Sequence, residues 1–135
     1  MDFRIPFGVR GHKYTEEEIA TTVAVMHGEA PLTQGACLHE FESRFRRYAG
    51  VEHAFAVSSA TAALEIAAQL CQFETDDEVI IPAHTYTSSA YPFVKAGATP
   101  VWADIDPDTR VVTAETISAC ISSRTRAVVV PHLYG

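Results

Sequence analysis

The sequence predicts an α/β protein built around a mainly parallel sheet with helices on both faces. Beyond residue 50, short runs rich in Val, Ile and Ala alternate with segments of helical periodicity, which is typical of parallel strands joined by crossover helices. These runs are continuously apolar, as expected for strands that are buried on both faces. We expect the 135 residues to form a single partial domain, with an N-terminal arm and two helices over 1–50 and the alternating part over 51–135.

Two helices are predicted after an extended arm over residues 1–14. The first runs from Thr15 to about His27, because Thr15-Glu-Glu-Glu18 forms a capping box with three acids in the first turn. A loop over 31–35 precedes the second helix, and Gly50 suits its C′ position. The apolar face predicted for this second helix consists of Leu38, Phe41, Phe45 and Tyr48.

Strands and helices alternate through the rest of the chain. The predicted strands are Ala54–Val57, Glu78–Ile81, Pro100–Ala103 and Ala127–Val130, and the predicted helices are Ala62–Phe73, Ser88–Ala96 and Ala114–Ile121. Ligands of such sheets bind where the strands end. We therefore expect three segments to lie near one another, namely Ser58–Thr61, Pro82–Tyr86 and Pro131–Gly135.

Composition narrows the class of protein. The net charge of −7 argues against a nucleic-acid partner and against an anionic membrane surface. Three scattered cysteines without a C-x-x-C pair fit reduced thiols and a cytoplasmic location. No apolar run approaches the roughly 20 residues of a membrane span.

The turn Ser58–Leu64 is the strongest candidate for a binding site. It lies between an apolar run and a helical segment, so backbone N–H groups and the positive end of the helix dipole converge there. Ser58, Ser59 and Thr61 add hydroxyl groups. The pattern therefore suits a phosphate, although the same hydroxyls also suit a simple helix cap.

Several motifs together resemble one enzyme family. They are Leu32–Gly35, Ala56–Leu64, Asp77–Tyr86, Ala96–Val101, Asp104–Thr109 and Val130–Gly135. In this order they look like the DegT/DnrJ/StrS aminotransferases, which are pyridoxal-phosphate (PLP) enzymes acting on sugar nucleotides. The resemblance implies the N-terminal part of the large PLP-binding domain of an aspartate-aminotransferase-like (fold type I) enzyme, and it covers only the front part of the family pattern.

The resemblance also implies a cofactor site made of Ser59, Ala60, Thr61 and Tyr86. Ala60 and Thr61 match the phosphate-cup positions, where Gly-Thr is usual, so alanine fits only if the backbone there needs no positive φ. Tyr86 matches the aromatic residue that stacks on the cofactor ring, although its side chain could equally pack in the core or at an interface. No catalytic residue and no metal site are predicted.

The chain contains two lysines, Lys13 and Lys95, and neither lies in the family's lysine context. PLP chemistry needs a Schiff-base lysine. We therefore expect the chain alone to be inactive and to bind PLP non-covalently at best. Two interpretations stay open: an N-terminal fragment of a sugar-nucleotide aminotransferase that forms a homodimer or pairs with a complementary C-terminal half, or a non-catalytic remnant that binds phosphate or pairs with an intact homologue.

One acidic segment imitates a calcium loop. Asp104, Asp106, Asp108 and Glu115 occupy positions 1, 3, 5 and 12 of that template, but Thr109 replaces its obligatory glycine. An acidic connection between a strand and a helix is the better interpretation.

Overall fold

The computed structural model describes residues 13–29, 31 and 33–133. It divides into two compact units, residues 1–56 and 57–135. The prediction that the whole chain forms one partial domain stays a prediction. In the part of the chain that is described, no helix is both long and apolar enough to cross a membrane.

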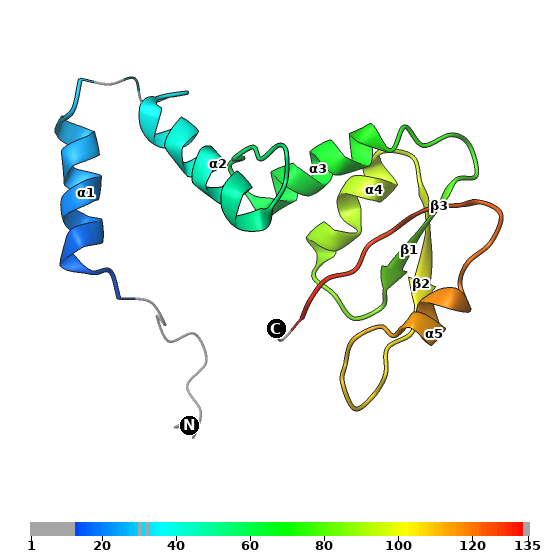
Figure 1. Cartoon of the computed structure of the whole chain (residues 1–135). Helices are drawn as coiled ribbons and strands as arrows, with labels where there is room; N and C mark the ends of the chain where they lie inside the picture. Colours follow the sequence, from blue (N-terminus) through cyan, green and yellow to red (C-terminus); the bar gives the residue numbers. More distant parts are fainter. Residues whose placement is uncertain (1–12, 30, 32, 134–135) are drawn as a thin grey trace, which may run out of the picture. The chain divides into compact units, whose positions relative to one another are not determined.

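The first unit contains α1 (Glu16–His27) and α2 (Ala36–Ala49) (Figure 1). The predicted capping box is confirmed: Thr15 Oγ1 accepts from the Glu18 N–H at 3.2 Å, and Glu18 Oε2 accepts from the Thr15 N–H at 2.7 Å. Gly50 ends α2 in the left-handed region with φ 67°, as predicted. The rings of Phe41 and Phe45 lie 6.2 Å apart on a face that is largely exposed.

The prediction of a strand over Ala54–Val57 is wrong. This segment has no regular secondary structure. An apolar run becomes a strand only when a neighbouring strand satisfies its backbone, and none of the three described strands pairs with it. The N–H group of Ala56 instead donates to Glu42 Oε1 of α2 at 2.9 Å.

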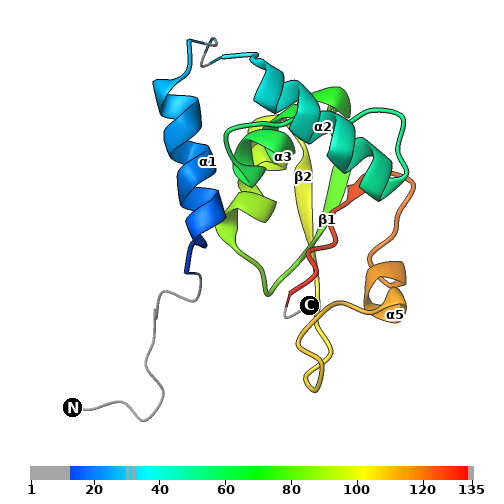
Figure 2. The ribbon, with the colours of Figure 1, turned by 60° about the vertical axis from the view of Figure 1, so that its left-hand side comes forward.

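The second unit confirms the predicted α/β class. Its three strands form one parallel sheet in the order β2-β1-β3 (Figures 1 and 2). In chain order its elements are α3 (Ala60–Leu70), β1 (Glu78–Pro82), the 3₁₀ helix η1 (Thr87–Ser89), α4 (Tyr91–Lys95), β2 (Thr99–Ala103), α5 (Ala114–Ser118) and β3 (Thr125–Val128).

Several predicted boundaries shift. The predicted helix Ser88–Ala96 is split into η1 and α4, because Pro92 lacks an N–H group and fits only in the first turn of a new helix. α3 begins two residues earlier than predicted, since Ser59 caps it. The strand predicted over Ala127–Val130 begins earlier, at Thr125, although the Val129 N–H group still donates to the Ile80 carbonyl at 2.9 Å.

The core lies between the sheet and the pair of helices α3 and α4. Val79 and Ile81 of β1 are fully buried and pack with Ala68 and Phe93. Ile80 is fully buried on the opposite face, because successive side chains of a strand alternate, and Figure 1 shows α5 on that side of the strands. The sheet therefore carries helices on both faces, as predicted.

Candidate cofactor-phosphate site

The N-terminus of α3 offers two free backbone donors. Ser59 precedes the helix in an extended conformation, and its Oγ accepts from the Ala62 N–H at 3.1 Å. Its carbonyl accepts from the Ala63 N–H at 3.1 Å. The N–H groups of Ala60 and Thr61 have no hydrogen bond to any residue that the structure describes. Both residues are exposed, so an anion has access to these donors and to the positive end of the helix dipole.

Alanine in place of the usual cup glycine is compatible with this geometry. Ala60 is the first residue of α3 and is not among the residues with positive φ. A methyl side chain therefore brings no backbone strain at this position. The sequence allowed a phosphate cup without glycine only if this residue needs no positive φ, and Ala60 meets that condition.

Tyr86 stands at the start of η1, in the connection that follows β1. Its backbone is extended, its carbonyl accepts from the Ser89 N–H at 2.9 Å, and its side chain is 77% exposed. η1 contacts α3, so the two predicted parts of the site lie on neighbouring elements. Within the described part of the chain, no ring contact or hydrogen bond joins the Tyr86 side chain to residues 59–61, so its stacking role stays a prediction.

The two lysines lie outside this group of residues. Lys95 is the last residue of α4, where its Nζ lies 3.4 Å from Glu65 Oε1 and 5.9 Å from the centre of the Tyr91 ring. Lys13 precedes α1 in the first unit. At the third predicted strand end, His132 is exposed, whereas Tyr134 and Gly135 lie outside the described residues.

The acidic segment Asp104–Thr109 folds as a capped turn. Asp106 Oδ1 accepts from the N–H groups of Asp108 and Thr109, at 3.0 and 2.7 Å, and from the Thr109 hydroxyl at 3.0 Å. These bonds, led by the Thr109 N–H, lower the pKa of Asp106. Within the described ranges, no three His, Cys, Asp or Glu side chains gather as a metal site.

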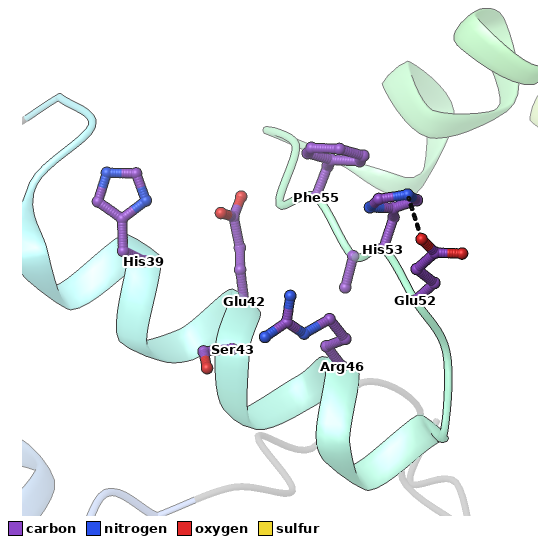
Figure 3. Close-up of a pocket in the computed structure, with 8 residues that line it drawn as sticks. His39, Glu42, Ser43, Arg46, Glu52, His53 and Phe55 are labelled. Carbon is purple, nitrogen blue, oxygen red and sulfur yellow. Dashed lines mark ion pairs between the residues drawn. The ribbon is translucent and has the colours of Figure 1, made fainter.

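A second concave region lies within the first unit and is drawn in Figure 3. It has a volume of about 240 Å³ and carries side chains of both charges, with Arg46 beside Glu42 on α2. His53 lies 3.6 Å from Glu52 and stacks on Phe55 with ring centres 6.2 Å apart. Since the acids and bases here face one another, the region lacks the single sign of charge that would select an ionic ligand.

Sequence reasoning missed an ionic cluster at the amino ends of β1 and β3, in which a buried carboxylate is bound by two exposed residues. Glu78 is 6% exposed, and its carboxylate accepts from the Ser122 hydroxyl and from Nε and Nη2 of Arg124. The Ser122 hydroxyl and then Arg124 lower the pKa of Glu78. The available signal was an acidic residue, Glu78, at the first position of the apolar strand β1 and a basic one, Arg124, directly before β3.

Proteins of known sequence and structure are similar to this chain. The chain is 43% identical over 101 residues to GDP-perosamine synthase of Caulobacter vibrioides, a match that spans 75% of this chain and 27% of that protein. An aminotransferase from Psychrobacter cryohalolentis superposes with a TM-score of 0.81 at 31% identity, over 96% of this chain and 33% of that one. The Streptococcus pneumoniae protein Spr1654, solved in a PLP form, superposes with a TM-score of 0.77 at 34% identity, over 86% of this chain and 29% of that one.

The parallel sheet, its flanking helices and the open N-terminus of α3 define the front part of an aminotransferase fold of the PLP type. The profile of one family, the DegT/DnrJ/EryC1/StrS aminotransferases, matches residues 12–135, and the chain belongs to that family. It spans about a quarter to a third of the length of the relatives it matches.

Proposed function

We propose that this chain supplies the phosphate-binding part of a PLP-dependent aminotransferase that acts on a keto-sugar nucleotide. The single observation that carries the proposal is the pair of free N–H groups of Ala60 and Thr61 at the exposed N-terminus of α3. Membership of a sugar aminotransferase family supports the reaction class. The GDP-perosamine synthase relative supports a nucleotide-linked sugar as the substrate.

The cup residues have separate tasks in this proposal. The N–H groups of Ala60 and Thr61 donate to phosphate oxygens, and the hydroxyls of Ser59 and Thr61 add two further donors. Ser59 Oγ keeps its lone pair on the Ala62 N–H group, so its own hydrogen is available to the phosphate. The ring of Tyr86 covers one face of the cofactor. PLP itself, when bound, supplies the electron sink for amino-group transfer.

The catalytic lysine and part of the substrate site lie outside this chain in the proposed enzyme. Lys95 is paired to Glu65 within the second unit, and neither Lys95 nor Lys13 lies in the family's lysine context, which supports non-covalent binding of PLP to this chain. The lysine and the rest of the substrate site come from another segment or from a second subunit, as a homodimer or a complementary C-terminal half. The alternative, a non-catalytic protein that binds phosphate or pairs with an intact homologue, uses the same cup.

Titration with inorganic phosphate and with PLP, followed by amide NMR, tests the proposal. We expect the amide signals of Ala60 and Thr61 to shift first. Thr61→Ala should weaken binding by about 1 kcal/mol for a neutral hydrogen bond, and by roughly twice that for a bond to a charged phosphate. Thr22→Ala is the matched control, because the Thr22 hydroxyl donates to the Glu18 carbonyl within α1. If no shift occurs at residues 59–61 at millimolar phosphate, the proposal is wrong.

A further inference from the structure

The amino-acid pattern of β3 does not by itself fix one register of this strand on β1. After Ala127 come three identical side chains, Val128, Val129 and Val130. In the structure Val129 packs against the core, whereas Val128 and Val130 are 41% and 48% exposed. Ala127 packs against the core together with Val129, so a slip by one residue in one direction would turn the charged Arg126 inward and is disfavoured. A slip in the other direction would place Val128 and Val130 there, a change of only two methyl groups, so packing distinguishes these two registers weakly.

The pairing of β1 with β3 is irregular at its first step. Glu78 pairs with Thr125, but Val79 pairs with Ala127, so Arg126 is the extra residue of a bulge. Beyond this point the pairing is regular, and the Val129 N–H group reaches the Ile80 carbonyl at 2.9 Å. The register of the valine run is therefore set at the bulge.

The ionic cluster of Glu78, Ser122 and Arg124 lies at this bulge; its carboxylate is buried, whereas the Arg124 side chain is 62% exposed. The Glu78 carboxylate accepts from Nε of Arg124 at 2.7 Å, from Nη2 of the same side chain and from the Ser122 hydroxyl. The same two residues are also joined through their backbones, since the Glu78 N–H group donates to the Arg124 carbonyl at 2.8 Å. Both Arg124 donors reach Oε1 and the Ser122 hydroxyl reaches Oε2, so both carboxylate oxygens depend on where the chain before β3 lies along β1. A one-residue slip, about 3.3 Å, would leave the buried carboxylate without these partners.

We infer that Glu78, together with Ser122 and Arg124, is a positioning group that sets the register of β3 on β1. Through the register it sets how far the Pro131–His132 segment reaches beyond the sheet beside the segment that carries Tyr86. The relevance of this edge to catalysis rests on the proposed function. The register itself does not, because it is a property of the sheet alone.

Amide hydrogen exchange of the valine run measures the register directly. Successive N–H groups of a strand point to opposite sides, so the bond to Ile80 protects Val129, and a slip by one residue moves protection to Val128 or Val130. For Glu78→Ala we expect the protection of the Val129 amide to fall at least tenfold while that of a neighbouring valine amide rises. Glu65→Gln is the matched control, because it also removes one carboxylate and one ion pair, the one to Lys95, within the same unit.

Milder variants keep the test decisive if Glu78→Ala does not fold. Arg124→Lys keeps the charge and loses the fork, and Glu78→Gln keeps the shape and loses the charge. Partial transfer of protection in either variant, absent in Glu65→Gln, supports the inference. A uniform loss of protection along β3 without transfer between valines would show that the cluster only stabilises the sheet, and would overturn it. Because no phosphate enters this experiment, its failure is distinct from a failed phosphate titration.

Discussion

Replacing Ser59 by aspartate or by alanine separates the two roles of this side chain, the helix cap and the phosphate ligand. Ser59 Oγ accepts from the Ala62 N–H at 3.1 Å. An aspartate accepts equally well at this position, so Ser59→Asp should leave the free energy of unfolding within a few tenths of a kcal/mol of the wild type. Ser59→Ala removes the acceptor and should cost about 1 kcal/mol.

Phosphate binding should respond in the opposite order. An anion held by the N–H groups of Ala60 and Thr61 would lie about 4 Å from the carboxylate introduced by Ser59→Asp, where two unit charges repel by about 1 kcal/mol in water. A phosphate with nearly two charges then loses about 2 kcal/mol, which corresponds to roughly thirtyfold weaker binding. Ser59→Ala loses only one hydroxyl donor, worth about 1 kcal/mol.

Urea unfolding followed by circular dichroism and phosphate titration followed by amide NMR measure the two effects. Thr113→Asp is the matched control, because Thr113 caps α5 by accepting from the Thr116 N–H at 3.3 Å, and the same charge is introduced there. The reasoning is refuted if Ser59→Asp binds phosphate as tightly as Thr113→Asp does. Phosphate would then bind somewhere other than at the N-terminus of α3.

Two further predictions concern the second unit. Ile81→Ala should lower the free energy of unfolding, measured by urea titration, by about 2–5 kcal/mol, because the Ile81 side chain is fully buried. The control Ile66→Ala should lower it clearly less, since Ile66 is 48% exposed. Equal losses of stability would contradict the described core. The lowered pKa of Glu78 means that its contribution to stability is present above the unfolded-state pKa of about 4.3 and is lost as the pH falls through the lower folded-state pKa. Unfolding of the wild type and of Glu78→Gln, measured between pH 6 and about pH 3, should therefore converge at the acid end, and parallel curves would contradict the assigned ion pair.

Local signals in the sequence determined much of this protein. The capping box of Thr15 and Glu18 and the C′ glycine Gly50 are formed by neighbouring residues, so their outcome does not depend on the rest of the fold. The alternation of apolar runs and helices was enough to predict a parallel sheet. The same local chemistry explains why Ser59 caps the N-terminus of α3, and the family resemblance then suggested a phosphate as the ligand there.

Tertiary structure decided the features that depend on partners distant in sequence. The run Ala54–Val57 has the composition of a strand, yet none of the described strands pairs with it, and the Ala56 N–H group donates to Glu42 instead. The three valines after Ala127 carry no register signal of their own, and Glu78 meets Arg124 across 46 residues of sequence only because the sheet places the two strand ends together. Local sequence specifies caps and periodicity because these are short-range, whereas strand pairing, register and charge pairs between strand ends are decided only when the strands meet.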